Sequence, residues 1–154
     1  VKVVSSRDQA LFGVLATALP SNSTPRRLDL DWRYCVDVPD LAPVILALVK
    51  NVGVKTLKVD GFGSMDESLC TAMKDGLGMN TTLESLELDS GPLTDDNYDL
   101  WCRALSFLLT NKSLKSLVVN LRVDGIESRV AAFRSVVVAV LEENVSLESL
   151  SISS

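Results

Sequence analysis

The side chains in this sequence best suited to chemistry are three aspartates, Asp31, Asp60 and Asp89, which recur at an interval of 29 residues. Each directly follows a short apolar segment. If these segments are neighbouring strands, successive carboxylates lie about 4.8 Å apart, and like charges at that spacing repel unless something compensates them. Three uses would explain the row: a docking strip for lysine or arginine of a protein partner, a weak Ca²⁺ site of oxygen ligands, or caps for the turn after each strand.

Enzymatic constellations are nearly absent from the chain. There is no histidine, so neither a Ser-His nor a Cys-His nucleophile pair can form. The phosphate-binding pattern GxxxxGK with Ser or Thr and the dinucleotide-binding pattern GxGxxG are missing. The lone glycine pair Gly61 and Gly63 is better explained by a turn. We therefore expect a protein that is not an enzyme and that needs no cofactor and no metal ion.

Composition excludes further classes of function. The 154 residues carry a net charge of −5, and an acidic balance argues against a nucleic-acid partner, because that binding depends on Lys and Arg. No apolar run reaches the roughly 18–20 residues of a membrane span. The cysteines Cys35, Cys70 and Cys102 are odd in number and widely separated, so we expect reduced thiols. Reduced thiols favour a reducing compartment and hence a cytoplasmic location.

Five asparagines give the chain its period. They stand at positions 22, 51, 80, 111 and 144, at intervals of 29, 29, 31 and 33, and three residues after each of them a short apolar segment opens. A pattern that stays in phase over the whole chain indicates a repeat protein. Apolar periodicity predicts strands over residues 1–4, 25–30, 54–59, 83–88, 114–119 and 147–152, and helices over 7–19, 39–50, 67–78, 98–110 and 128–143. Because strands alternate with helices, we expect an α/β fold with a parallel sheet.

Four of these asparagines, all but Asn51, stand in Asn-x-Ser/Thr triplets. In a secreted protein such triplets could carry glycans. A structural role is the stronger interpretation, because the asparagine belongs to the repeat and Ser or Thr is a natural turn residue beside it.

Side chains alternate along a strand, so the residues between the inner apolar positions face away from the core. Three rows across neighbouring strands are predicted on this basis. The first is Arg27, Thr56, Ser85, Ser116 and Ser149; the second is Asp29, Lys58, Glu87, Val118 and Ser151; the third is Asp31, Asp60, Asp89, Asn120 and Ser153. The second row begins with charges of alternating sign, which indicates a surface charge ladder of little net stability.

The strand pattern LxxLxL, a helix in every unit, a period near 29 and the phrases NTTLESL and NKSLKSL resemble leucine-rich repeats of the long, ribonuclease-inhibitor-like class. The resemblance covers essentially the whole chain. It implies a horseshoe-shaped α/β solenoid of about four repeats plus a terminal strand, with a parallel concave sheet and convex helices. It also implies that the concave face binds proteins.

The sequence departs from this class at several points. Pro25 stands where the second unit should have its first strand leucine, the last intervals stretch to 31 and 33 residues, and neither end shows a clear polar cap. We expect residues 1–154 to form a single leucine-rich-repeat domain that is a fragment of a longer array or of a multidomain protein. Uncapped ends also predict self-association.

The function expected from the resemblance is a protein-interaction module whose partner offers a basic surface; the alternative is a structural scaffold or spacer in a larger protein. Trp32 and Tyr34, in the loop after the second strand, suit an interface, although Trp32 could instead cover the edge of that strand. Trp101 falls on a core-facing helical stripe. The predicted binding residues are Arg27, Asp29, Asp31, Thr56, Lys58, Asp60, Ser85, Glu87, Asp89 and Asn120 on the concave face, and Trp32 and Tyr34 in the loop.

Overall fold

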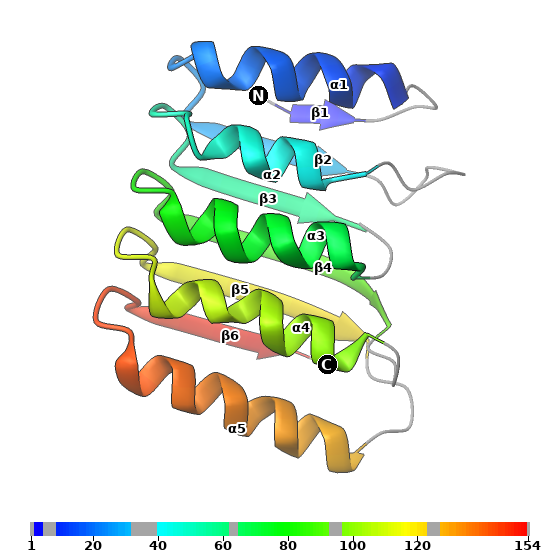
Figure 1. Ribbon diagram of the computed structural model, residues 1–154, viewed down its shortest axis with the longest axis vertical. Helices are drawn as coiled ribbons and strands as arrows, with labels where there is room; N and C mark the ends of the chain where they lie inside the picture. The colour runs from blue at the N-terminus through cyan, green and yellow to red at the C-terminus, as the bar shows by residue number, and fades with distance from the viewer. Residues whose placement is uncertain are drawn as a thin grey trace.

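A computed structural model of the protein describes residues 2–4, 9–31, 40–61, 65–92, 97–122 and 127–153. In this part of the chain six parallel strands form one sheet in chain order, and the helices all cover the same face of it (Figure 1). The strands are β1 (Lys2–Val4), β2 (Arg27–Asp31), β3 (Thr56–Asp60), β4 (Ser85–Pro92), β5 (Ser116–Arg122) and β6 (Ser149–Ser153). The α/β alternation and the parallel sheet expected from the sequence are confirmed.

Five α-helices return the chain from the end of one strand to the start of the next within the described ranges. They are α1 (Gln9–Ala18), α2 (Ala42–Leu48), α3 (Glu67–Thr71), α4 (Tyr98–Leu105) and α5 (Glu127–Glu143). Three of them continue in a tighter or wider turn, namely η1 (Leu19–Ser21), the π-helical η2 (Ala72–Leu77) and η3 (Ser106–Leu109). The start of α3 is capped as its sequence suggests, because Asp66 Oδ1 accepts the N–H of Leu69 at 2.8 Å.

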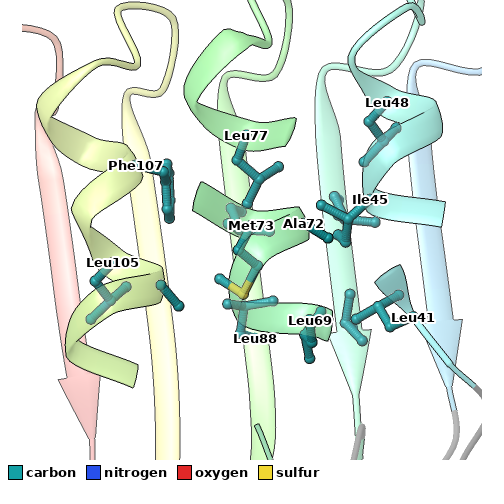
Figure 2. Packing of buried hydrophobic residues seen from close by; sticks show 14 of the residues in the cluster. Leu41, Ile45, Leu48, Leu69, Ala72, Met73, Leu77, Leu88, Leu105 and Phe107 are labelled. Atoms are coloured by element: carbon teal, nitrogen blue, oxygen red, sulfur yellow. The ribbon is translucent and has the colours of Figure 1, made fainter. Parts of the chain in front are cut away.

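The core lies between the sheet and the helix layer. Inner strand residues such as Leu57 and Leu86 are fully buried, and so is Trp101, as its helical position predicts. Figure 2 shows the helix side chains that meet them: Ile45, Met73 and Phe107, from three successive helical segments, project into this layer. Each unit alone would expose half of this apolar surface, so stacking the units is what buries it. No described helix is both long and apolar enough to cross a bilayer.

The recurring asparagines join the units to one another. Asn111 Nδ2 donates to the carbonyl oxygens of Leu77 at 2.6 Å and of Asn80 at 2.9 Å, in the preceding turn. Its Oδ1 accepts the N–H groups of Ser113 and Leu114 in its own turn, at 3.0 and 2.7 Å. Asn51, Asn80 and Asn144 repeat this arrangement, each donating to the turn before it. We call this series the asparagine ladder.

The ladder explains the Asn-x-Ser/Thr triplets. The amide nitrogen of Asn80, which a glycan would require, is buried and donates to Leu48 O at 2.5 Å. The Thr82 hydroxyl donates to Asn51 O at 3.0 Å, and Ser113 repeats this contact to Asn80 O at 3.1 Å. The side chains of both the asparagine and the hydroxyl residue therefore form hydrogen bonds that join neighbouring turns.

The ladder also corrects the predicted strand starts. Strands β2 to β6 begin two residues later than the sequence analysis placed them, at residues 27, 56, 85, 116 and 149. At β3 to β5 the reason is local: the N–H three residues after the asparagine, as at Val54 and Leu83, is held by the asparagine Oδ1 and belongs to the turn. The third-row residues that were expected just after the strands, such as Asp60, are instead paired within the sheet.

Replacing Asn111 by Ala should lower the free energy of unfolding by about 3–5 kcal/mol. The N–H groups of Ser113 and Leu114 lose their acceptor, at about 1–3 kcal/mol for each group left unsatisfied, and the carbonyls of Leu77 and Asn80 each lose a donor. Urea unfolding followed by circular dichroism measures this. The matched control is Asn22→Ala, because Asn22 is exposed and, within the described part of the chain, its side chain accepts one hydrogen bond, from the Thr24 N–H. Equal losses for the two variants would contradict the structural role of the ladder.

Replacing Gly53 by Ala should also destabilise the fold, by at least ~1 kcal/mol. A Cβ atom there would lie 2.2 Å from the carbonyl oxygen of Ser23 in the neighbouring turn, so the two turns could not approach as they do. Gly13 in α1 is the control, since a Cβ there meets nothing within 4 Å and alanine suits a helix interior better. The midpoint temperature of thermal unfolding should be lower for Gly53→Ala and unchanged or higher for Gly13→Ala.

Candidate functional site

One face of the sheet carries no helices, and we call it the open face (Figure 1). The predicted binding residues of the strands lie on it, because they alternate with buried residues such as Leu57 and Leu86. Strand pairing aligns them as expected. Thr56 pairs with Arg27 and Ser85, Lys58 with Asp29 and Glu87, and Asp60 with Asp31 and Asp89. The rows continue across β5 and β6 through Ser116 and Ser149, Val118 and Ser151, and Asn120 and Ser153. The predicted register is therefore confirmed in all three rows, whereas a binding role for these residues stays a prediction.

The open face has two halves of different chemistry. The half formed by β2, β3 and β4 carries two cations and five carboxylates, a net charge of −3. On β5 and β6 the three rows consist of serine, valine and asparagine. The charged residues are Arg27, Asp29, Asp31, Lys58, Asp60, Glu87 and Asp89.

Lys58 lies at the centre of the charged half. Its Nζ is 2.6 Å from Glu87 Oε1 on the next strand and 3.3 Å from Asp60 Oδ1 on its own strand. The hydrogen bond to Glu87, followed by the contacts with Asp60, raises the pKa of Lys58 and outweighs the opposing effect of partial burial. Of the charge ladder predicted for the second row, the step from Lys58 to Glu87 is present, whereas Asp29 pairs with Arg27 of the first row. Lys58 also contacts Asp60 of the third row.

The other charges of this half differ in how much they can offer a partner. Arg27 Nε donates to both carboxylate oxygens of Asp29, at 2.8 and 3.0 Å. Asp31 is only 7% exposed and presents little surface. Asp89 is half-buried, and among the described residues its carboxylate makes no hydrogen bond and no ion pair. Asp89 is thus the third-row carboxylate most available to a cation from outside.

Metal binding finds no support in the described segments. No group of three or more His, Cys, Asp or Glu residues in them lies close enough together to hold an ion. The thiols of Cys70 and Cys102 are free, and burial raises the pKa of both, which disfavours the reactive thiolate. Trp32, Tyr34 and Cys35 lie outside the described residues, so the loop prediction has no outcome here.

The sequence analysis missed a fourth row, which runs along the start of the sheet. It consists of the residues four after each asparagine, and the backbone N–H of each later member donates to the carbonyl of the one before at 2.8 Å. Glu84 lies between Lys55 at 3.0 Å and Lys115 at 4.0 Å, and the hydrogen bond with Lys55 lowers the pKa of Glu84. Their constant offset from the asparagine was the available signal. The row is Arg26, Lys55, Glu84, Lys115 and Glu148.

No protein-family model and no curated protein sequence matches the chain. Two examples of solved structures with a similar fold are actin-binding site 2 of leiomodin-1 and a tropomodulin C-terminal domain. Actin-binding site 2 of leiomodin-1 is 22% identical with a TM-score of 0.68, and the alignment covers 94% of this chain and 80% of that one. The tropomodulin C-terminal domain from Caenorhabditis elegans is 16% identical with a TM-score of 0.71, covering 93% of this chain and 83% of that one.

These likenesses concern the fold alone, because both identities are low. They support the leucine-rich-repeat-like architecture with a parallel sheet that the sequence predicts. The narrower assignment to the ribonuclease-inhibitor-like class remains a prediction.

The ion pairs of Lys58 should stabilise the protein at neutral pH, and this contribution to the free energy of unfolding should be lost at high pH. Because the pKa of Lys58 is raised above its ordinary value of 10.5, its contribution is complete below that pH and is lost as the pH rises further. Lys58→Met should therefore be less stable than the unmodified protein by about 1 kcal/mol near neutrality. The difference should shrink above pH 10.5.

Urea unfolding of both proteins between about pH 7 and 11.5 measures this difference, in the range that brackets an ordinary lysine pKa. Lys112→Met is the control, because the exposed Lys112 ammonium makes one hydrogen bond to the described residues, to the carbonyl oxygen of Leu109 at 3.3 Å, and no ion pair with them. A constant gap between Lys58→Met and the unmodified protein over the whole range would contradict the assignment.

Proposed function

We propose that this chain is a protein-interaction module that binds actin, and that the open face is its binding surface. The observation that carries the proposal is this face itself: a sheet surface without covering helices, with a net charge of −3 on three strands and an available carboxylate at Asp89. The choice of actin rests on the similar fold of leiomodin-1 actin-binding site 2. That likeness favours a binding role over the scaffold or spacer alternative.

The shape and cellular setting belong to the same proposal. About four repeats and a terminal strand would form a horseshoe-shaped leucine-rich-repeat solenoid whose concave side is the open face. Such a module would act without enzymatic activity and in the cytoplasm. The short serine side chains of the rows on β5 and β6 would let a partner approach the sheet closely.

Charge should set how the partner is chosen. The Lys58 ammonium partly compensates the negative charges of Glu87 and Asp60. The remaining negative potential is therefore strongest near Asp89. A partner that brings lysine or arginine to this position gains attraction, and complementary charges at an interface mainly add association rate and specificity. Binding should weaken as salt rises, because the contact is partly exposed.

The test is co-sedimentation of the purified chain with actin filaments, at low and at about 0.3 M salt. Asp89→Lys should weaken binding about tenfold, the change expected from roughly 1.4 kcal/mol. The matched control is Glu142→Lys, an identical charge reversal at an exposed position near the end of α5, where a cation suits the helix dipole.

The outcomes separate the parts of the proposal. If Asp89→Lys binds actin as tightly as the unmodified chain, the binding site does not lie on the open face, although actin remains the partner. Failure of the unmodified chain to sediment with filaments, together with failure to bind monomeric actin, would exclude actin. An equal loss in Asp89→Lys and Glu142→Lys would mean that net charge alone governs the contact.

A further inference from the structure

A second exposed surface lies along the edge where helices turn into strands. Four successive turn segments, residues 22–26, 50–55, 79–84 and 109–115, are stacked along this edge (Figure 1). Hydrogen bonds of the asparagine ladder connect each segment to the next. We call these four segments together the turn edge.

The turn edge is positive in a protein that is negative overall. It carries five cations, Arg26, Lys50, Lys55, Lys112 and Lys115, and one carboxylate, Glu84, so its net charge is +4, whereas the chain as a whole has −5. Arg26, Lys50, Lys112 and Lys115 are exposed, and Lys55 is half-buried. Glu84 is held between Lys55 and Lys115, which fixes these two ammonium groups in place. Cations are therefore concentrated here.

Large apolar side chains lie among these cations. Val52 and Met79 are each 64% exposed, and Leu109 is 39% exposed. Each belongs to a different one of three successive turns. These three residues are not core residues, and the core positions of the same turns are occupied by the buried Val54, Leu83 and Leu114.

The turns are rigid enough to hold this pattern. Asn51, Asn80 and Asn111 are buried and satisfy backbone groups of two turns each, and Gly53 lets its turn approach the neighbouring one closely. At their strand ends neighbouring turns are hydrogen-bonded to one another, so there they have the roughly 4.8 Å spacing of strands. A helix with a pitch of about 5.4 Å that lies along the edge could therefore offer one apolar side chain to each turn.

We propose that the turn edge is a docking surface for an acidic amphipathic helix of a protein partner. The helix places its apolar side chains on Val52, Met79 and Leu109, and its carboxylates meet the surrounding lysines. A nucleic acid would not use the three apolar contacts, and a membrane surface would meet Glu84 in the middle of the patch. This surface is separate from the open face and opposite to it in charge.

The last turn marks one limit of the surface. Around Asn144 the exposed charged residues are Glu142, Glu143 and Glu148, which reverse the sign of the edge. An acidic helix is repelled there, so it occupies only the four earlier turns. The reversal also gives the bound helix a preferred position along the edge.

The test uses the full chain and a synthetic, fluorescein-labelled peptide of about 18 residues, five helical turns, built from Leu at every third or fourth position with Glu between them. Fluorescence anisotropy measures binding at low salt. The double variant Lys50→Glu with Lys112→Glu should weaken binding at least tenfold, and Met79→Gln should weaken it several-fold while Met79→Leu restores it. Lys74→Glu with Arg134→Glu, an equal charge change on exposed helix positions away from the edge, should leave binding unchanged.

Each other outcome would overturn the proposal. Equal binding by the two double variants would show a response to net charge alone, and equal binding of a peptide with Lys in place of Glu would show a purely apolar contact. If the chain does not bind the peptide, or binds only phosphatidylserine vesicles or single-stranded RNA, the turn edge is not a docking surface for a helix. Asp89→Lys should bind the peptide normally, so this experiment and the actin experiment can fail independently.

Discussion

The asparagine ladder, formed by Asn51, Asn80, Asn111 and Asn144, holds the rest of this structure in register. The amide nitrogen of Asn111 satisfies carbonyl groups at the end of the preceding unit, and its oxygen satisfies N–H groups in its own turn. Because a single side chain serves backbone groups of two units, it sets the distance between turns and the residue at which each strand begins. The alignment of the open-face rows follows from that register. Buried backbone groups left without such a partner would destabilise the whole stack.

The same register separates charge into two surfaces. Positions between the inner leucines bring carboxylates together on the open face, and positions beside the asparagine bring lysines together on the turn edge. A net charge of −5 for the chain conceals this separation. Partners of opposite chemistry can therefore be held on different sides of one small domain. A repeat fold allows this because its outward positions are free to vary while its inward positions are not.

Much of this arrangement could be predicted because repeat proteins turn sequence spacing directly into spatial neighbourhood. The parallel sheet, the buried Leu83, Leu86 and Leu88, and all three open-face rows follow from the period and from strand alternation. The strand starts could not be predicted, since they depend on which N–H groups the asparagine oxygen takes. The turn edge was not predicted because only part of it is periodic: Arg26, Lys55 and Lys115 share one offset from the asparagine, whereas its apolar residues and the other two lysines stand at different offsets.

The sequence by itself determined which residues are repeated, which face the core and which carboxylates share a row, because these depend only on spacing. Only the tertiary structure decided how the charged groups are used. It ties Lys58 to Glu87 and Asp60, buries Asp31 at 7% exposure, and leaves Asp89 without an ion pair among the described residues. These outcomes depend on side-chain reach and on the solvent left around each group, which spacing along a chain does not specify.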